Sequence, residues 1–237
     1  MNVKNSALFF VVKFSAFSLA VALVATYMGS AVAKTASISV DKPIRTIVID
    51  AGHGGIDGGA VADDGTLEKD LNLALAKTVE RLLISLGADV VMTRTDDVMF
   101  AESSSPHKKL DDLTHRIKTT GSAVDAVFVS IHMNKFPVQK YSGLQVYYSK
   151  NNEESHALAD VLQSAAQAYI QPQNARQTKA AGDEIYLLSK LTCPAVLIEC
   201  GFLSNHDELA LLKTEEYRNK LAAVIAVTVT EYVNQVK

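Results

Sequence analysis

The chain of 237 residues lacks the features that mark nucleic-acid-binding proteins. It contains no run of lysine and arginine, and its 26 acidic residues outnumber its 23 basic ones. A mildly acidic chain offers no basic patch for a phosphate backbone, so we expect no nucleic-acid partner. The sequence also has no internal repeat and no low-complexity block. Because 48% of the residues are hydrophobic, the chain can bury one sizeable core, and one main domain is expected.

Cysteine is nearly absent, with Cys193 and Cys200 as its two examples. They flank a predicted strand, and seven residues of extended chain separate their positions by over ~20 Å. A disulfide needs its two Cα atoms within about 7 Å of each other. We therefore expect both cysteines to be unpaired and buried.

Charge is almost absent from the first 33 residues, where Lys4 and Lys13 are the only charged side chains. Residues 14–28 are small and apolar, and Ala31-Val32-Ala33 resembles a cleavage site. This pattern predicts a secretory signal peptide. The alternative is an uncleaved membrane anchor, since Lys13 lies inside the apolar region.

In either case the working part of the protein is expected outside the cytoplasm. We predict a signal peptide or anchor over residues 1–33, a linker over residues 34–43 and a folded domain over residues 44–237. Without residues 1–33, 21 basic residues remain against 26 acidic ones, a formal charge of about −5.

The rest of the chain alternates short apolar runs with amphipathic segments, which is typical of an α/β domain. The predicted strands cover residues 46–50, 89–94, 126–131, 143–148 and 194–202. The predicted helices cover residues 71–86, a segment from Asp111 or Asp112 to Thr120, residues 153–170, a short segment after Ser204, and a long segment containing Leu221 and Tyr232. Thr66 is the predicted cap of the first helix, and the first two strands are expected to pair in parallel.

Two of the predicted strands lead directly to a histidine. The strand over residues 46–50 is followed by Gly52-His53-Gly54-Gly55, where glycine allows the backbone to turn sharply around the imidazole. The strand over residues 126–131 is followed by His132. If these strands are neighbours, two imidazole nitrogens meet at one edge of the sheet.

Two glutamates occupy positions where packing does not require a carboxylate. Glu68 lies three residues before Leu71 and is predicted on the inward face of the first helix. It could alternatively complement the helix dipole alone. Glu199 interrupts the end of an apolar strand, where a carboxylate loses solvation and needs a partner or a function. Its alternative is a glutamate balanced by a buried arginine or lysine.

His53, Glu68 and His132 together form a two-nitrogen, one-oxygen ligand set that suits catalytic zinc. Glu199 suits an acid/base that moves a proton from water to a departing amine. Zinc-assisted amide hydrolysis is therefore the chemistry that these residues indicate. Arg94 and Asn134 are candidate substrate-binding residues, although Arg94 could instead pair with a nearby aspartate, Asp96 or Asp97.

Four segments in this order resemble the zinc-dependent N-acetylmuramoyl-L-alanine amidases over about residues 44–237. They are Asp50-Ala51-Gly52-His53-Gly54-Gly55, Glu68-Lys69, Ser130-Ile131-His132-Met133-Asn134 and the eight residues from Ile198 to Asn205. The resemblance implies a mixed, mostly parallel six-stranded sheet with helices on both faces. It also implies one zinc ion on His53, Glu68 and His132, and Glu199 as catalytic acid/base. The implied substrate is the amide between the lactyl group of N-acetylmuramic acid and L-alanine in peptidoglycan.

Within that family, the chain is similar to the germination-specific amidases that process the spore cortex before muramic-δ-lactam forms. The interval between His132 and Glu199 has no room for the long inhibitory helical insertion of some members, and no wall-binding repeat is expected. An extracytoplasmic activator or targeting protein is therefore an expected partner. Two alternatives stay open: another zinc peptidase or amidohydrolase of the cell wall, and a non-catalytic wall-binding domain.

Overall fold

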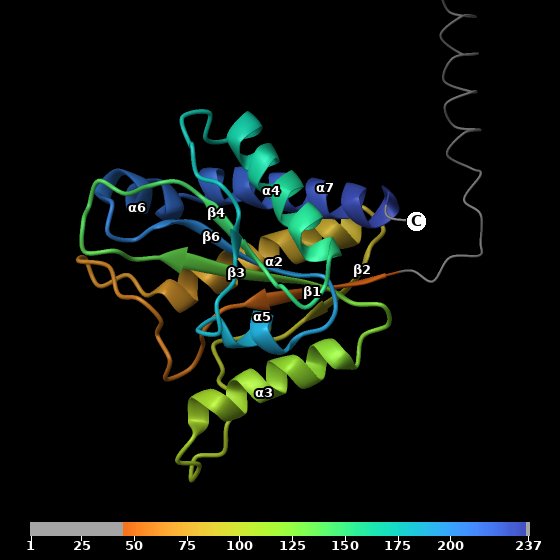
Figure 1. Cartoon of the computed structure of the whole chain (residues 1–237). Coiled ribbons are helices and arrows are strands. Elements are labelled where there is room, and N and C mark those ends of the chain that lie inside the picture. Colours follow the sequence, from red (N-terminus) through yellow and green to blue (C-terminus); the bar gives the residue numbers. More distant parts are fainter. Residues whose placement is uncertain (1–44, 236–237) are drawn as a thin grey trace, which may run out of the picture. The chain divides into compact units, whose positions relative to one another are not determined.

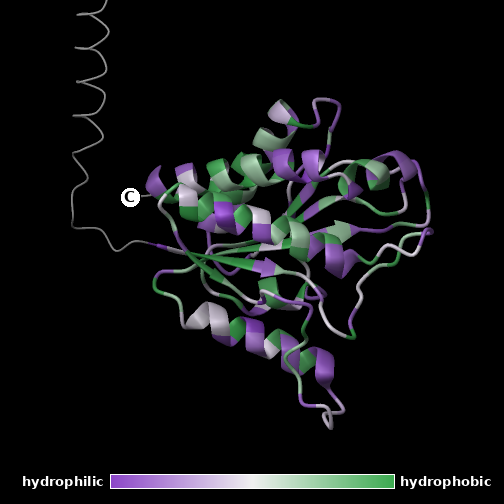
Figure 2. Ribbon diagram, turned by 180° about the vertical axis from the view of Figure 1, so that it is seen from behind, coloured by the Kyte–Doolittle hydropathy of each residue, from purple (hydrophilic) through white to green (hydrophobic). Residues whose placement is uncertain are grey.

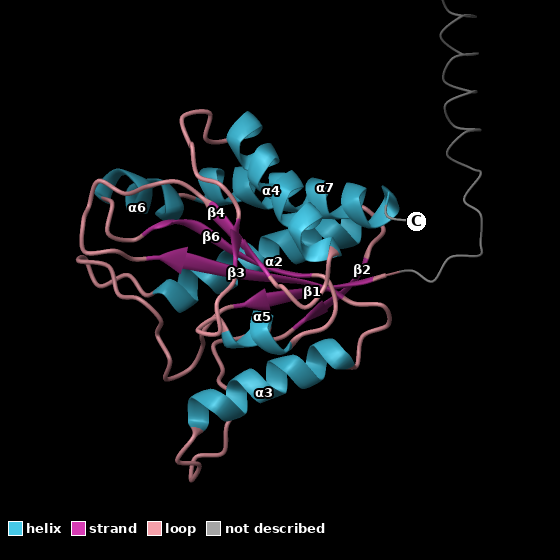
Figure 3. Cartoon of the chain, in the orientation of Figure 1, coloured by secondary structure: helices cyan, strands magenta, loops and turns pink. Residues whose placement is uncertain are grey.

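The structure is a computed structural model that describes residues 45–235. The strands are β1 (Thr46–Ala51), β2 (Asp89–Met92), β3 (Val127–Asn134), β4 (Gln145–Tyr148), β5 (Lys179–Ala180) and β6 (Ala195–Phe202). The helices are α2 (Glu68–Ser85), α3 (Lys108–Gly121), α4 (Glu154–Tyr169), α5 (Tyr186–Lys190), α6 (His206–Lys213) and α7 (Glu215–Gln235) (Figure 3). The signal peptide or anchor predicted over residues 1–33 and the linker over residues 34–43 lie outside the described residues.

The six strands form one sheet in the order β2-β1-β3-β6-β4-β5 (Figure 1). Parallel pairing joins β1 to β2 and β3, β3 to β6, and β4 to β5, whereas β4 runs antiparallel to β6. The predicted mixed, mostly parallel α/β sheet is confirmed. Because β1, β3 and β6 are parallel neighbours, their C-terminal ends meet at one edge of the sheet.

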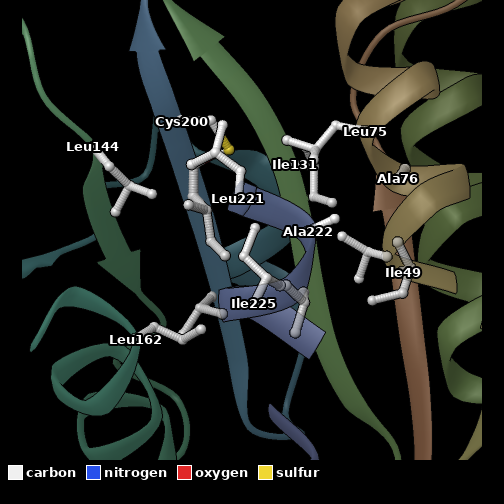
Figure 4. Close-up of a cluster of buried hydrophobic side chains, with 14 of the residues drawn as sticks. Ile49, Leu75, Ala76, Ile131, Leu144, Leu162, Cys200, Leu221, Ala222 and Ile225 are labelled. Carbon is white, nitrogen blue, oxygen red and sulfur yellow. The ribbon is translucent and has the colours of Figure 1, made fainter. Parts of the chain in front are cut away.

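Alternating side chains on the strands supply two cores, one on each face of the sheet. Ile47 and Ile49 of β1 join a cluster with α2, α4 and α7, whereas Val48 joins a cluster with α5 and α3. Figure 4 shows Leu221 and Ile225 of α7 lying over the strands in the first cluster. Hydrophobic colouring is concentrated in the strands and the inward sides of these helices (Figure 2). Helices therefore cover both faces, as predicted.

Two helix boundaries differ from the predictions. Thr66 does not cap α2: Leu67 occupies the cap position and provides no side-chain hydrogen bond. Helix α3 begins at Lys108, so Asp111 and Asp112 lie inside it. Asp112 is buried and accepts a hydrogen bond from Arg116 one turn later, a role that holds it within the helix instead of at its start. No helix of residues 45–235 is long and apolar enough to cross a membrane.

The segment between α4 and β6 holds two elements that the sequence did not predict. Strand β5 has two exposed residues and therefore no apolar alternation to reveal it. Helix α5 is only five residues long. Both cysteines are free as expected, but only Cys200 is buried, and Cys193 is partly exposed.

Candidate active site

His53 follows the end of β1 in an unusual backbone conformation. Its φ of 62° lies in the left-handed region, which residues other than glycine seldom adopt. In this conformation Nε2 lies 3.2 Å from Oε2 of Glu68 and Nδ1 lies 2.9 Å from Oδ2 of Asp57. Burial alone would lower the pKa of His53, but hydrogen bonds and charges of these two carboxylates raise it above its ordinary value. Each ring nitrogen of His53 thus faces a carboxylate, and together the two carboxylates fix the orientation of the imidazole.

His132 lies inside β3 and not in a loop after it, because this strand continues to Asn134. The expectation that the strand ends at Ile131 is therefore wrong. Ala51 and Ile131 are register partners in the parallel pairing of β1 and β3, which brings the two histidines together. Their ring centroids are 5.0 Å apart. Nδ1 of His132 lies 2.9 Å from Oε1 of Glu68.

Glu68 joins the two histidines from the first turn of α2, where it is 4% exposed. Its carboxylate also accepts hydrogen bonds from the backbone N–H of Ala60, the backbone N–H of Met133 and the side-chain amide of Asn72. Burial alone would raise its pKa, yet the hydrogen bonds and charges of the histidines hold the pKa of Glu68 far below its usual range. Glu68 is thus an ionised carboxylate, the form that binds metal ions.

Two glycines allow these side chains to approach the backbone. A Cβ atom on Gly52 would overlap the ring of His132. A Cβ atom on Gly59 would lie 2.6 Å from Oε2 of Glu68 and 2.7 Å from Cδ2 of His53. Both distances are shorter than van der Waals contact, so the site needs glycine at these positions.

Glu199 extends from β6 beside His132, its register partner on β3. Oε2 of Glu199 is out of contact with solvent and has no hydrogen-bonding partner among residues 45–235. Burial raises the pKa of Glu199 to about 7, with the charges of the histidines opposing this shift and the charge of Glu68 adding to it. These are the charges that act on it most strongly, and its buried oxygen contacts no arginine or lysine of residues 45–235. An orphaned carboxyl of this kind is typical of a functional site.

Arg94 is buried, so its guanidinium group is not open to a substrate. It is 2% exposed and donates hydrogen bonds to the carbonyl oxygens of Ala51, Gly52, Lys69 and Asp96. The substrate-binding expectation is therefore corrected, and the alternative of a side-chain ion pair with Asp96 or Asp97 is also wrong. A substrate contact of Asn134, the last residue of β3, stays a prediction.

One ligand atom each from His53, Glu68 and His132 lies within 4.8 Å of the other two. Two imidazole nitrogens and one carboxylate oxygen form a donor set that fits a divalent metal ion with an open position. The arrangement can therefore bind a metal ion beside an unpartnered carboxyl group, which is the combination that metal-assisted hydrolysis uses.

Residues 47–231 match the family described as N-acetylmuramoyl-L-alanine amidase. The chain belongs to this family. The amidase is 36% identical over 191 residues to the germination-specific N-acetylmuramoyl-L-alanine amidase of Bacillus subtilis, a match that covers 79% of each chain.

Solved structures agree with this assignment. The CwlD amidase of Clostridioides difficile, solved in complex with the GerS lipoprotein, is 39% identical with a TM-score of 0.76, covering 80% of this chain and 98% of that one. The amidase AmiC2 of Nostoc punctiforme is 33% identical with a TM-score of 0.70, covering 82% and 99%. The chain is thus an enzyme that cleaves the bond between N-acetylmuramic acid and L-alanine in peptidoglycan.

Sequence reasoning missed two residues of this amidase's site, Asp57 and Asn72. Asp57 contacts His53 from within the same glycine-rich loop. The available signal in the sequence was that a carboxylate lies only four residues after the histidine. Asn72 is fully buried and donates to both Gly52 O and Glu68 Oε1. An asparagine one turn after Glu68 on an apolar helix face was the available signal.

Proposed function

We propose that this amidase binds one zinc ion through His53, Glu68 and His132, and that Glu199 is its catalytic acid/base. The observation that carries the proposal is the convergence of two imidazoles and one ionised carboxylate within 4.8 Å. The orphaned carboxyl of Glu199 on the adjacent strand supports the second half of the proposal. Zinc, when bound, polarises the amide carbonyl and lowers the pKa of water.

Glu199 performs the proton transfers of the reaction. As a carboxylate it accepts a proton from the attacking water, and as a carboxylic acid it gives that proton to the departing amine nitrogen of L-alanine. A pKa raised to about 7 by burial suits a group that must both accept and donate near neutral pH. Asp57 and Asn72 keep His53 and Glu68 oriented throughout.

The setting that we propose is the spore cortex, outside the cytoplasm. The Bacillus subtilis relative named as germination-specific supports this, because it matches 79% of this chain. Cleavage there frees muramic acid from its stem peptide, the step that must precede muramic-δ-lactam formation.

We also infer that an extracytoplasmic protein binds the enzyme and activates or targets it. The Clostridioides difficile relative was solved in complex with a lipoprotein, which supports a protein partner for this chain as well. Full activity and correct targeting of the isolated enzyme on intact sacculi would contradict this part of the proposal.

Mass spectrometry of peptidoglycan digested by the purified, zinc-loaded protein tests the reaction. We expect free stem peptides that begin in L-alanine, together with glycan that carries free lactyl carboxylates. The Glu199→Ala protein should release them at least about 10²-fold more slowly, whereas Glu231→Ala, which removes an exposed carboxylate of α7, should act like the wild type. Cleavage inside the stem would identify a peptidase. An unchanged effect of Glu199→Ala protein on peptidoglycan would indicate a non-catalytic domain.

A further inference from the structure

Two arginines lie buried beneath the loop that carries His53. Arg94 follows β2 and Arg116 belongs to α3, and each is 2% exposed. The proposed chemistry uses neither of them. Burying a guanidinium group costs free energy, and apolar side chains of similar volume often give a protein of equal or greater stability. Packing alone therefore does not explain why two arginines lie here.

The two guanidinium groups converge on three consecutive carbonyl groups. Arg94 donates from Nε to Ala51 O at 2.8 Å and from Nη2 to Gly52 O at 3.0 Å. Arg116 donates from Nη1 to Ala51 O at 2.8 Å and from Nη2 to His53 O at 2.7 Å. Every carbonyl from the end of β1 to the proposed zinc ligand therefore accepts a hydrogen bond from a buried cation.

Arg116 is itself fixed by two carboxylates. It lies 2.7 Å from Oδ1 of Asp50 and 2.8 Å from Oδ2 of Asp112. Asp50 is fully buried and also accepts hydrogen bonds from Thr93, which follows β2, and from Ser130, its partner on β3. The cluster thus ties α3, β1 and β3 together directly below the loop.

The hydrogen bonds of Arg94 have a different pattern. Within the described part of the chain they all reach carbonyl oxygens, from Lys69 at the start of α2 as well as from the loop. Arg94 therefore connects the backbone beside Glu68 to the backbone beside His53. It thus links the chain neighbours of two of the three residues that offer ligand atoms.

The backbone at His53 needs such support. A non-glycine residue with φ of 62° is held only where its surroundings determine the conformation. We propose that Arg94 and Arg116 are positioning residues that fix the carbonyls of residues 51–53 and thereby set the affinity of the site for its metal ion. This inference rests on the proposed zinc site and adds the residues that shape it.

The test uses Arg94→Lys and Arg116→Lys, which keep a positive charge but lose the planar fork that reaches two carbonyls at once. Zinc affinity is measured by competition with a chromogenic chelator. We expect the Kd for zinc to rise about 10- to 100-fold, the usual effect of removing a group that orients a metal ligand. The absorption spectrum of the Co²⁺-loaded variants, which reports ligand geometry, should differ from that of the wild type.

Arg45→Lys is the matched control. Arg45 is a largely buried arginine that pairs with Asp125 and Glu154 at the start of β1, the opposite end of the strand from His53. Thermal unfolding of the metal-free proteins gives the loss of stability for each variant. Arg45→Lys should lose stability without a change in zinc Kd or in the Co²⁺ spectrum.

Wild-type affinity and spectrum in the Arg94→Lys protein, with any loss confined to thermal stability, would overturn the inference. Arg94→Lys decides the outcome alone if Arg116→Lys fails to fold. The proposed zinc site has its own readout, since His132→Ala should abolish zinc binding. A wild-type protein that binds no zinc, or a His132→Ala protein that binds it as tightly, would overturn the zinc site and this inference together.

Discussion

His132 of β3 and Glu199 of β6 are direct partners in the parallel pairing of these two strands. Partners in register present their side chains on the same face of a sheet. One residue is a proposed zinc ligand and the other the proposed acid/base, so the separation of the two functions is fixed by hydrogen-bonded strands. A site on such rigid elements keeps its geometry better than one built on loops alone.

The two partners are predicted to fail differently when they are replaced. His132→Ala should lose zinc and activity together, because one of three ligand atoms is gone. Glu199→Ala should bind zinc normally and lose turnover, by about 10²-fold or more for a missing acid/base. Zinc content by atomic absorption and initial rates on purified peptidoglycan separate the outcomes. A zinc-loaded and active His132→Ala protein would contradict the ligand assignment.

The orientation of His53 is predicted to depend on Asp57, whose Oδ2 lies 2.9 Å from Nδ1 of the ring. Asp57→Ala should weaken zinc binding about 10- to 100-fold, whereas Asp57→Asn, which keeps an acceptor oxygen, should fall between this variant and the wild type. Chelator competition provides the measurement. Asp63→Ala, which removes an exposed carboxylate from the same connection, is the control. Equal affinity of Asp57→Ala and the control protein would exclude an orienting role.

The sequence predicted those residues of the candidate site that interrupt an apolar pattern, and it did not predict the others. His53, Glu68, His132 and Glu199 were chosen as candidates because a polar residue at the end of an apolar run, or on the inward face of a helix, breaks a strong pattern. Asp57 could not be assigned, since glycines around it leave the direction of its side chain open. The hydrogen bonds of Arg94 could not be predicted either, because every residue has a backbone carbonyl and the sequence does not show which of them a side chain will reach.

The fold could likewise be predicted where the sequence has a strong apolar pattern, and not elsewhere. The strands that form the centre of the sheet are apolar runs, and each was placed to within a few residues. Strand β5 was missed, since its two exposed residues pair with Tyr147 and Tyr148 only through the backbone. The cap of α3 was placed four or five residues too late because Asp111 and Asp112 resembled caps, while the true cap, His107, makes no side-chain hydrogen bond.

The close contact between Gly52 and the ring of His132 predicts a strong effect of a single methyl group. Gly52→Ala places a Cβ atom on the imidazole, so the ring must rotate away from Glu68. We expect zinc affinity to fall at least about 10-fold while the circular dichroism spectrum stays unchanged. Gly65→Ala is a useful comparison, since a Cβ there meets nothing within 4 Å and tests backbone strain alone. Wild-type zinc affinity in Gly52→Ala would show that the ring tolerates the displacement.

The raised pKa of Glu199 predicts a pH-dependent cost to the stability of the metal-free protein. Burial moves this pKa from 4.5 to about 7, so between these values the folded protein binds more protons than the unfolded chain. The free energy of unfolding therefore decreases as pH rises through this range, by about 3 kcal/mol in total at 1.36 kcal/mol per pKa unit.

The Glu199→Gln variant tests this prediction, because it has no carboxyl group to ionise and so removes this cost. Urea unfolding of the zinc-free proteins should show the variant more stable by up to about 3 kcal/mol at pH 8, with the difference disappearing near pH 4.5. The same difference at both pH values would mean that ionisation of Glu199 is not its cause.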